Sequence, residues 1–224
     1  WAISDNGSDC FGNAFITTWK TDNPGTSNSN QITIPISSSF TDIYNYNVDW
    51  GDGNISNGLT SGTTHTYLSP GTYTVKINGL FPRINFYNSG DKQKLITVAQ
   101  WGNNHWTSMA RAFYEAINMT VTATDTPDLS GVTDMSEMFS GAISFNTNIN
   151  NWDVSNVTDM TGVFGTTYTY QTNIFNQPLD NWDVSNVTKM GWMFNGAAQF
   201  NQDISNWDVS KVTDMQVMFW GAAA

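Results

Sequence analysis

A short pattern that recurs through the second half of the chain constrains the fold more than any other feature. Its shared form is Trp-Asp-Val-Ser-Asn-Val-Thr-x-Met-x-x-Met-Phe, and the clearest copies begin at Trp152, Trp182 and Trp207. The aligned segments are 129–139, 154–164, 184–194 and 209–219, which follow one another at spacings of 25, 30 and 25 residues. A degenerate copy around Trp106 precedes them. We therefore expect about five stacked units, with a surface insertion at 166–172 that accounts for the longer spacing.

Each unit divides into two parts with different periodicities. Trp207 and Val209 alternate with Asp208, which predicts a short strand with the two apolar side chains on one face and the carboxylate on the other. Met215 and Phe219 are four residues apart, which is the spacing of neighbours on one side of a helical turn. A unit this short cannot bury its apolar face alone, but stacked copies share a core. The pattern predicts a leucine-rich-repeat-like solenoid with short helical turns and about 25 residues per repeat.

The first half of the chain has a different pattern, typical of antiparallel sheets. Residues 31–36, 44–50 and 72–77 predict strands, and Gly51-Asp52-Gly53 predicts a tight turn. Pro35 cannot donate a ladder hydrogen bond and must lie at an edge or a bulge. We expect a mainly β chain with three parts: a linker or the end of a preceding domain at 1–13, an immunoglobulin-type β-sandwich at 14–99, and the repeats at 100–224.

Composition excludes several classes of protein. Charged residues make up only 12% of the chain and aromatic residues 14%, which excludes a disordered protein, and the abundance of Asn, Thr, Ser and Gly excludes a helical bundle. The formal charge of −11 repels phosphate, so nucleic acid is not an expected partner. No stretch approaches the ~18 apolar residues of a membrane span, so we expect no membrane insertion. Cys10 is the only cysteine, which excludes a disulfide within the chain.

Two segments resemble known families. Residues 48–53 (Val-Asp-Trp-Gly-Asp-Gly), with Thr-His-Thr-Tyr at 64–67 and Pro-Gly-Thr-Tyr-Thr-Val at 70–75, resemble the PKD domain, an immunoglobulin-like sandwich. Residues 200–219, from Phe-Asn to Met-Phe, resemble the repeats of BspA-type leucine-rich-repeat surface proteins of bacteria. The resemblance implies a secreted or surface-anchored bacterial protein that serves in adhesion.

One aspartate occupies the same position in successive repeats, and these residues are our candidates for a ligand-binding face. They are Asp128, Asp153, Asp183 and Asp208. Stacking at the ~4.8 Å spacing of strands would make neighbouring carboxylates repel by roughly 0.9 kcal/mol even at the dielectric constant of water. A bound cation, raised pKa values or hydrogen bonds from nearby Ser and Asn would each relieve the row. The alternative is purely structural: each Asp accepts hydrogen bonds within its own turn and stays ionised.

Two other repeated positions are expected to be structural. Trp152, Trp182 and Trp207 could form an exposed strip for stacking on sugars, but their alternation with Asp predicts that they face the core. Three asparagines that follow Phe are expected to form an internal ladder that satisfies turn backbone. They are Asn146, Asn176 and Asn201.

Asp49 and Asp52 flank Gly51 and are candidate calcium ligands, although a hairpin turn explains them equally well. Calcium is the one possible cofactor that the sequence suggests. His65 and His105 lie in different parts of the chain without a nucleophile or base beside them, and no hydrolase, P-loop or dinucleotide motif occurs. The sequence therefore predicts a protein that is not an enzyme.

We expect a non-catalytic module of an exported bacterial surface adhesin, located outside the cell. It would bind an extracellular protein or polysaccharide through its repetitive face, with further repeats of the same chain packed against it. The alternative is an accessory carbohydrate-binding or spacer region of a large secreted hydrolase. A purely structural role for both halves is a third possibility.

Overall fold

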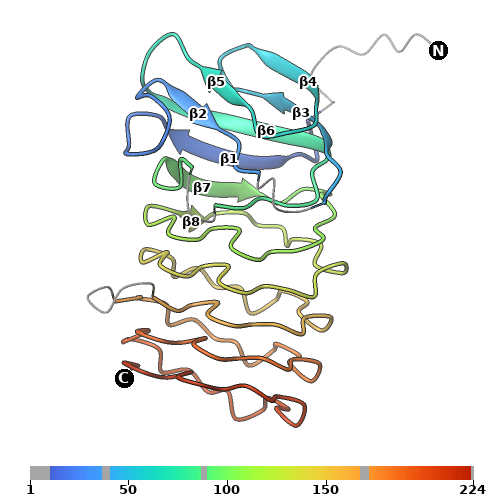
Figure 1. The fold of residues 1–224 in the computed structure, drawn as a ribbon, viewed down its shortest axis with the longest axis vertical. Coiled ribbons are helices and arrows are strands. Elements are labelled where there is room, and N and C mark those ends of the chain that lie inside the picture. Colours follow the sequence, from blue (N-terminus) through green and yellow to red (C-terminus); the bar gives the residue numbers. More distant parts are fainter. Residues whose placement is uncertain (1–10, 37–40, 87–89, 167–171, 223–224) are drawn as a thin grey trace, which may run out of the picture.

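The computed structural model describes residues 11–36, 41–86, 90–166 and 172–222. Cys10, most of the expected N-terminal linker at 1–13 and most of the expected insertion at 166–172 lie outside these residues. Figure 1 shows two parts: a group of β-strands at one end, and below it a column of winding chain that carries the repeats.

The strands form two sheets, and their order along the chain differs from their order in space. The larger sheet has the order β4-β3-β6-β1-β7-β8, and β2 pairs with β5 in a separate two-stranded sheet. All pairs are antiparallel except β7 with β8, which is parallel. The strands are β1 (Phe15–Lys20), β2 (Gln31–Thr33), β3 (Asn45–Asp49), β4 (Ile55–Leu59), β5 (Thr64–Thr66), β6 (Thr72–Leu80), β7 (Leu95–Gln100) and β8 (Thr120–Val121).

The sequence pattern of the first half locates its strands correctly. The three expected strands correspond to β2, β3 and β6. Gly51 and Gly53, both with positive φ, make the turn between β3 and β4, where an added Cβ at Gly51 would come within 2.3 Å of the Thr74 carbonyl oxygen. Pro35 follows the end of β2 and therefore removes no ladder hydrogen bond.

Successive repeats are joined by hydrogen bonds from alternate backbone N–H groups, and we call residues 101–222 the repeat stack. The N–H groups of Met135, Glu137 and Phe139 donate to carbonyl oxygens of the next repeat at 3.0, 2.7 and 3.0 Å. The acceptors are Asp159, Thr161 and Val163. The same bonds recur one repeat later, from Met160, Gly162 and Phe164. Each repeat is thus hydrogen-bonded to the repeats before and after it.

The expected helical turns are wrong, because the structure contains no helix among the described residues. The third residue of each Met-x-x-Met segment, which reads Met-x-x-Val at 160–163, has left-handed φ, namely 54° at Glu137, 65° at Gly162, 62° at Trp192 and 60° at Val217. A right-handed helix cannot pass through such a residue. The N–H of Met138 instead donates to the carbonyl of Met135, three residues back, which makes a turn.

The predicted leucine-rich-repeat solenoid is also wrong, although the chain is mainly β as expected. A leucine-rich repeat carries a strand in each unit, whereas the described part of the repeat stack has one two-residue strand, β8, and isolated parallel bridges. The expected strand around Trp207 is not formed. Its predicted facing is nevertheless right in the repeat before, where Trp182 and Val184 are buried and Asp183 is exposed.

The core of the repeat stack is a series of phenylalanine rings, one from each repeat. Adjacent rings of this series are nearly parallel, with centroids 5.5 to 6.0 Å apart. The series is Phe113, Phe139, Phe164, Phe194 and Phe219. A second phenylalanine ring, from the Phe-Asn pair that follows, packs against several of them, as Phe145 does against Phe139 at 3.9 Å. Burial of these rings replaces the large core that so short a unit cannot build alone.

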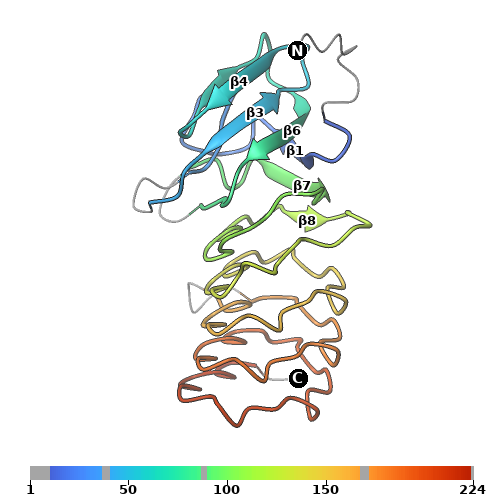
Figure 2. The ribbon, with the colours of Figure 1, turned by 90° about the vertical axis from the view of Figure 1, so that its right-hand side faces the viewer.

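The two halves of the chain share one core. β8, from the first repeat, extends the large sheet by pairing with β7 (Figure 2). Phe15 in β1 contacts the ring of Trp101, which in turn contacts Trp152 in the repeats. The expected boundary at residues 99 and 100 therefore coincides with the end of β7 and is not a flexible linker.

We predict that Phe164→Ala lowers the free energy of unfolding by about 3–5 kcal/mol, since Phe164 is fully buried between neighbouring rings. Urea unfolding measures this. Phe219→Ala is the matched control, because Phe219 belongs to the same series but is 47% exposed, and its loss should cost less than half as much. Equal effects of the two substitutions would contradict the ring series as the core.

Candidate functional site

The repeated aspartates Asp128, Asp153, Asp183 and Asp208 each accept hydrogen bonds inside their own turn. In every case the backbone N–H of the serine two residues later donates to Oδ1, at 3.0 to 3.1 Å. The hydroxyl groups of Ser130 and Ser155 add a second bond of 2.6 Å. We call these four residues the aspartate column. The structural alternative from the sequence, hydrogen bonding within the turn, is confirmed.

The charge state of the aspartate column follows from these bonds. Hydrogen bonds from Ser155, first from its side chain and then from its backbone, lower the pKa of Asp153 below the ordinary value, although the nearby charge of Asp183 raises it. Ser185 lowers the pKa of Asp183 in the same way, against the charge of Asp208. Hydrogen bonding therefore outweighs repulsion between neighbours, and the column stays ionised at neutral pH. Raised pKa values are not how the row is relieved.

A second column of carboxylates is interrupted by a lysine. Asp134, Asp159, Lys189 and Asp214 form successive parallel bridges from repeat to repeat. Lys189 donates to Asp159 at 2.9 Å. That bond and the surrounding negative charge raise the pKa of Lys189 above its ordinary value. The aspartates of this column also accept backbone hydrogen bonds within their own turns, and Lys189 adds a positive charge to these bonds.

Trp152, Trp182 and Trp207 are buried, as expected, and do not form an exposed strip. The indole N–H groups of Trp182 and Trp207 each donate to a carbonyl of the preceding repeat at 3.0 Å. The asparagine ladder is also present. The Oδ1 atoms of Asn146 and Asn176 accept from the backbone N–H of the next ladder member at 2.9 Å. These side chains lie at the surface and not inside the core as expected.

The two calcium candidates each have protein partners. Asp49 accepts from the backbone N–H of Gly51 and pairs with Lys76 at 3.3 Å. Asp52 pairs with His65 at 2.8 Å and accepts two bonds from Asn54. Within the residues that the structure describes, no group of three or more His, Cys, Asp or Glu side chains is placed to hold a metal ion.

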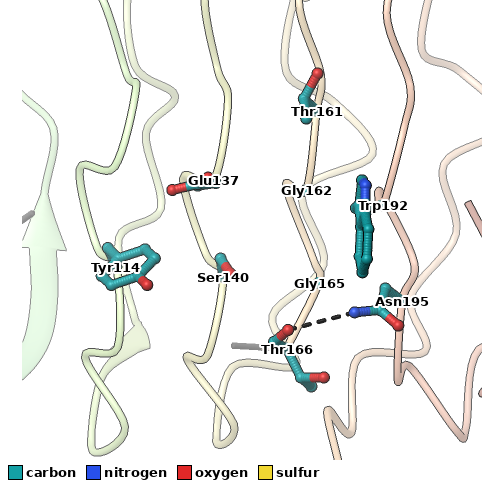
Figure 3. Close-up of a pocket in the computed structure, with 9 residues that line it drawn as sticks. All are labelled: Tyr114, Glu137, Ser140, Thr161, Gly162, Gly165, Thr166, Trp192 and Asn195. Atoms are coloured by element: carbon teal, nitrogen blue, oxygen red, sulfur yellow. Dashed lines mark hydrogen bonds between the residues drawn. The ribbon is translucent and has the colours of Figure 1, made fainter. Parts of the chain in front are cut away.

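A surface hollow of about 390 Å³ was not foreseen from the sequence. It opens in the repeat stack, and we name it the Trp192 hollow after one of its walls (Figure 3). Its principal lining residues are Glu137, Ser140, Gly162, Gly165, Trp192 and Asn195. Glu137 and Ser140 come from one repeat, the two glycines from the next, and Trp192 and Asn195 from the one after. The glycines leave an unfilled layer between two side-chain-bearing layers.

A signal for this hollow exists in the aligned repeats. The third residue of Met-x-x-Met varies between Glu137, Gly162, Trp192 and Val217. Gly162 and Trp192 hold this position in adjacent repeats. If these residues face outward, the difference in side-chain size predicts a hollow in the surface beside the tryptophan. The outward direction follows only from the left-handed backbone there, which the helical interpretation did not contain.

Comparison with known protein families matches residues 107–224 to the family described as "Mycoplasma protein of unknown function, DUF285". The match spans just over half of the 224 residues. No curated protein and no solved structure matches the chain. The identification as a BspA-type leucine-rich-repeat protein with a PKD-like domain is therefore wrong, because the repeats match a different family.

We predict that acid weakens folding through the aspartate column. A carboxylate whose pKa is lowered on folding contributes stability above its unfolded pKa of about 3.9, and this is lost as pH falls through the folded value. The urea concentration at the midpoint of unfolding should decrease as the pH is lowered from 5 to 2. In the double variant Asp153→Asn, Asp183→Asn the fall should be smaller, because the amide oxygen still accepts from serine but does not titrate. Identical pH profiles would refute this role.

Proposed function

This chain belongs to the DUF285 family, whose function is unknown, and we propose that it is a non-catalytic recognition module of an exported bacterial surface protein. It would act outside the cell and bind an extracellular polysaccharide or protein through the surface of the repeat stack. The observation that carries the proposal is the aspartate column, which presents ionised groups at regular intervals on a framework fixed by backbone hydrogen bonds.

The chemistry of the column supports binding better than catalysis. A general acid needs a pKa near the working pH. Hydrogen bonds from the serines lower the pKa values of the four aspartates, which keeps their carboxylates ionised. The serines are Ser130, Ser155, Ser185 and Ser210. Fixed charges repeated along an axis suit an extended ligand with repeated cationic or hydroxyl groups. Several weak contacts to such a ligand add up, since each bound unit raises the effective concentration of the next.

No helix among the described residues is long and apolar enough to cross a bilayer.

The alternative role, an accessory or spacer region of a secreted hydrolase, has one supporting observation. The core shared by the large sheet and the repeat stack makes the two halves one rigid piece, which is a useful property in a spacer. A spacer needs no ligand of its own. Binding measurements on the isolated chain therefore distinguish the two roles.

We predict that the chain binds ligands on an array of bacterial and host polysaccharides and extracellular proteins. The variant with Asp153, Asp183 and Asp208 all changed to Asn should bind at least about tenfold more weakly, because charged contacts set affinity while the amide keeps each turn intact. The control variant changes Asp22, Asp180 and Asp203 to Asn, which removes the same charge elsewhere. Equal binding by both variants would contradict the role of the column, and no binding by the unaltered chain would favour the spacer.

A further inference from the structure

Trp192 forms a flat aromatic wall of the Trp192 hollow, and Tyr114 is a second aromatic residue in the lining. Trp192 is 45% exposed, and Figure 3 shows its indole edge-on beside the layer that contains Gly162 and Gly165. Neither glycine carries a side chain that could cover the indole. An added Cβ at Gly165 would lie 2.8 Å from the Trp192 carbonyl oxygen, so Gly165 cannot easily be replaced by a residue with a side chain. The ring face therefore remains open to a ligand.

Stability does not explain a tryptophan at this position. Its φ of 62° is in the left-handed region, which glycine occupies without cost and side-chain-bearing residues adopt with strain. The equivalent residues of the other aligned repeats are Glu137, Gly162 and Val217, with φ of 54°, 65° and 60°, so the position does not require a large aromatic side chain. A large apolar side chain that is half exposed on a strained backbone stabilises little. Its presence indicates a use outside the core.

Polar groups border the aromatic wall. Ser140 and Thr166 are polar residues of the lining, whereas the hydroxyl of Thr161 is bonded to Asp159. Glu137 adds a carboxylate that pairs with Arg111 at 2.6 Å. Asn195 is buried, with 5% exposed, yet its amide is incompletely bonded. Its Nδ2 donates to the Thr166 carbonyl over a long 3.4 Å, and its Oδ1 is buried without a hydrogen-bond partner. A buried acceptor in this state is unfavourable unless a ligand or water completes it.

We propose that the Trp192 hollow binds one pyranose ring of a β-linked, gluco-configured polysaccharide, an inference that rests on the proposed recognition function and names its ligand. Such a ring has an apolar C–H face that fits against the electron-rich face of an indole, and equatorial hydroxyls at its edge that both donate and accept hydrogen bonds. The backbones of Glu137 and Trp192 are two repeats apart, about 10 Å at the strand spacing, which leaves room for one flat ring. An apolar peptide side chain would fill the space but leave Oδ1 of Asn195 without a hydrogen-bond donor.

Saturation-transfer NMR and calorimetry with methyl β-D-glucopyranoside and cellotetraose test this proposal on the full chain. We expect single-site binding of both sugars and no binding of the open-chain polyol sorbitol. Trp192→Gly should weaken binding by at least about tenfold while unfolding at the same or a higher temperature, because glycine suits the left-handed backbone. Gly162→Asn should weaken it similarly, since asparagine tolerates positive φ and fills the hollow. Trp220→Ala is the matched control, as Trp220 is 58% exposed but does not line the hollow.

The outcomes separate this proposal from the broader one. Retained sugar binding in Trp192→Gly, or equal loss in Trp220→Ala, overturns the assignment of the hollow. Array binding that depends on the aspartate column, with no response to either sugar, also overturns it and leaves the recognition function standing. Binding of an apolar peptide in place of the sugars would show that the occupant is a protein side chain. No binding to any sugar or array component removes both proposals.

Discussion

The donation of alternate backbone N–H groups to the next repeat is the interaction on which the rest of the structure depends. A short repeat without helices has many backbone groups to satisfy and little core of its own. Bonds such as Met135 N–H to the Asp159 carbonyl satisfy these groups and at the same time set the distance between repeats. That distance brings the phenylalanine rings into contact and places equivalent polar side chains one above another. The phenylalanine core, the turns and the columns of polar side chains therefore all depend on the hydrogen bonds between repeats.

The sequence predicted which residues share a position and which face they occupy, but not the backbone conformation that puts them there. Trp182 inside and Asp183 outside follow from alternation, since burial of an apolar side chain is a demand of any fold. The Met-x-x-Met-Phe segment was misjudged because a four-residue spacing fits a helical turn as well as two consecutive turns. The choice between them is made by Glu137 and its equivalents, whose left-handed φ is stabilised by bonds to another repeat. Such long-range bonds are invisible in a local pattern.

The two candidate sites also differ in how far they could be predicted from the sequence. The aspartate column could be predicted from repetition alone, and even its serine partners are two residues away in the chain. The Trp192 hollow could not, because its lining comes from four repeats and includes Gly162 and Gly165, which have no side chains. Its depth depends on which residue each repeat places at one outward position. A substitution in the neighbouring repeat would alter it as much as a change at Trp192 itself.

The parallel pairing of β7 with β8 joins the repeat stack to the large sheet, so a force that pulls on the stack is passed to the sheet through these two strands. The backbone hydrogen bonds of the repeat stack connect adjacent layers and run along the axis of the column. Traction along that axis would be transmitted through every layer in series to β7 and then into the antiparallel sheet. Because each layer is held mainly by its neighbours, the layers would separate one after another and not all at once.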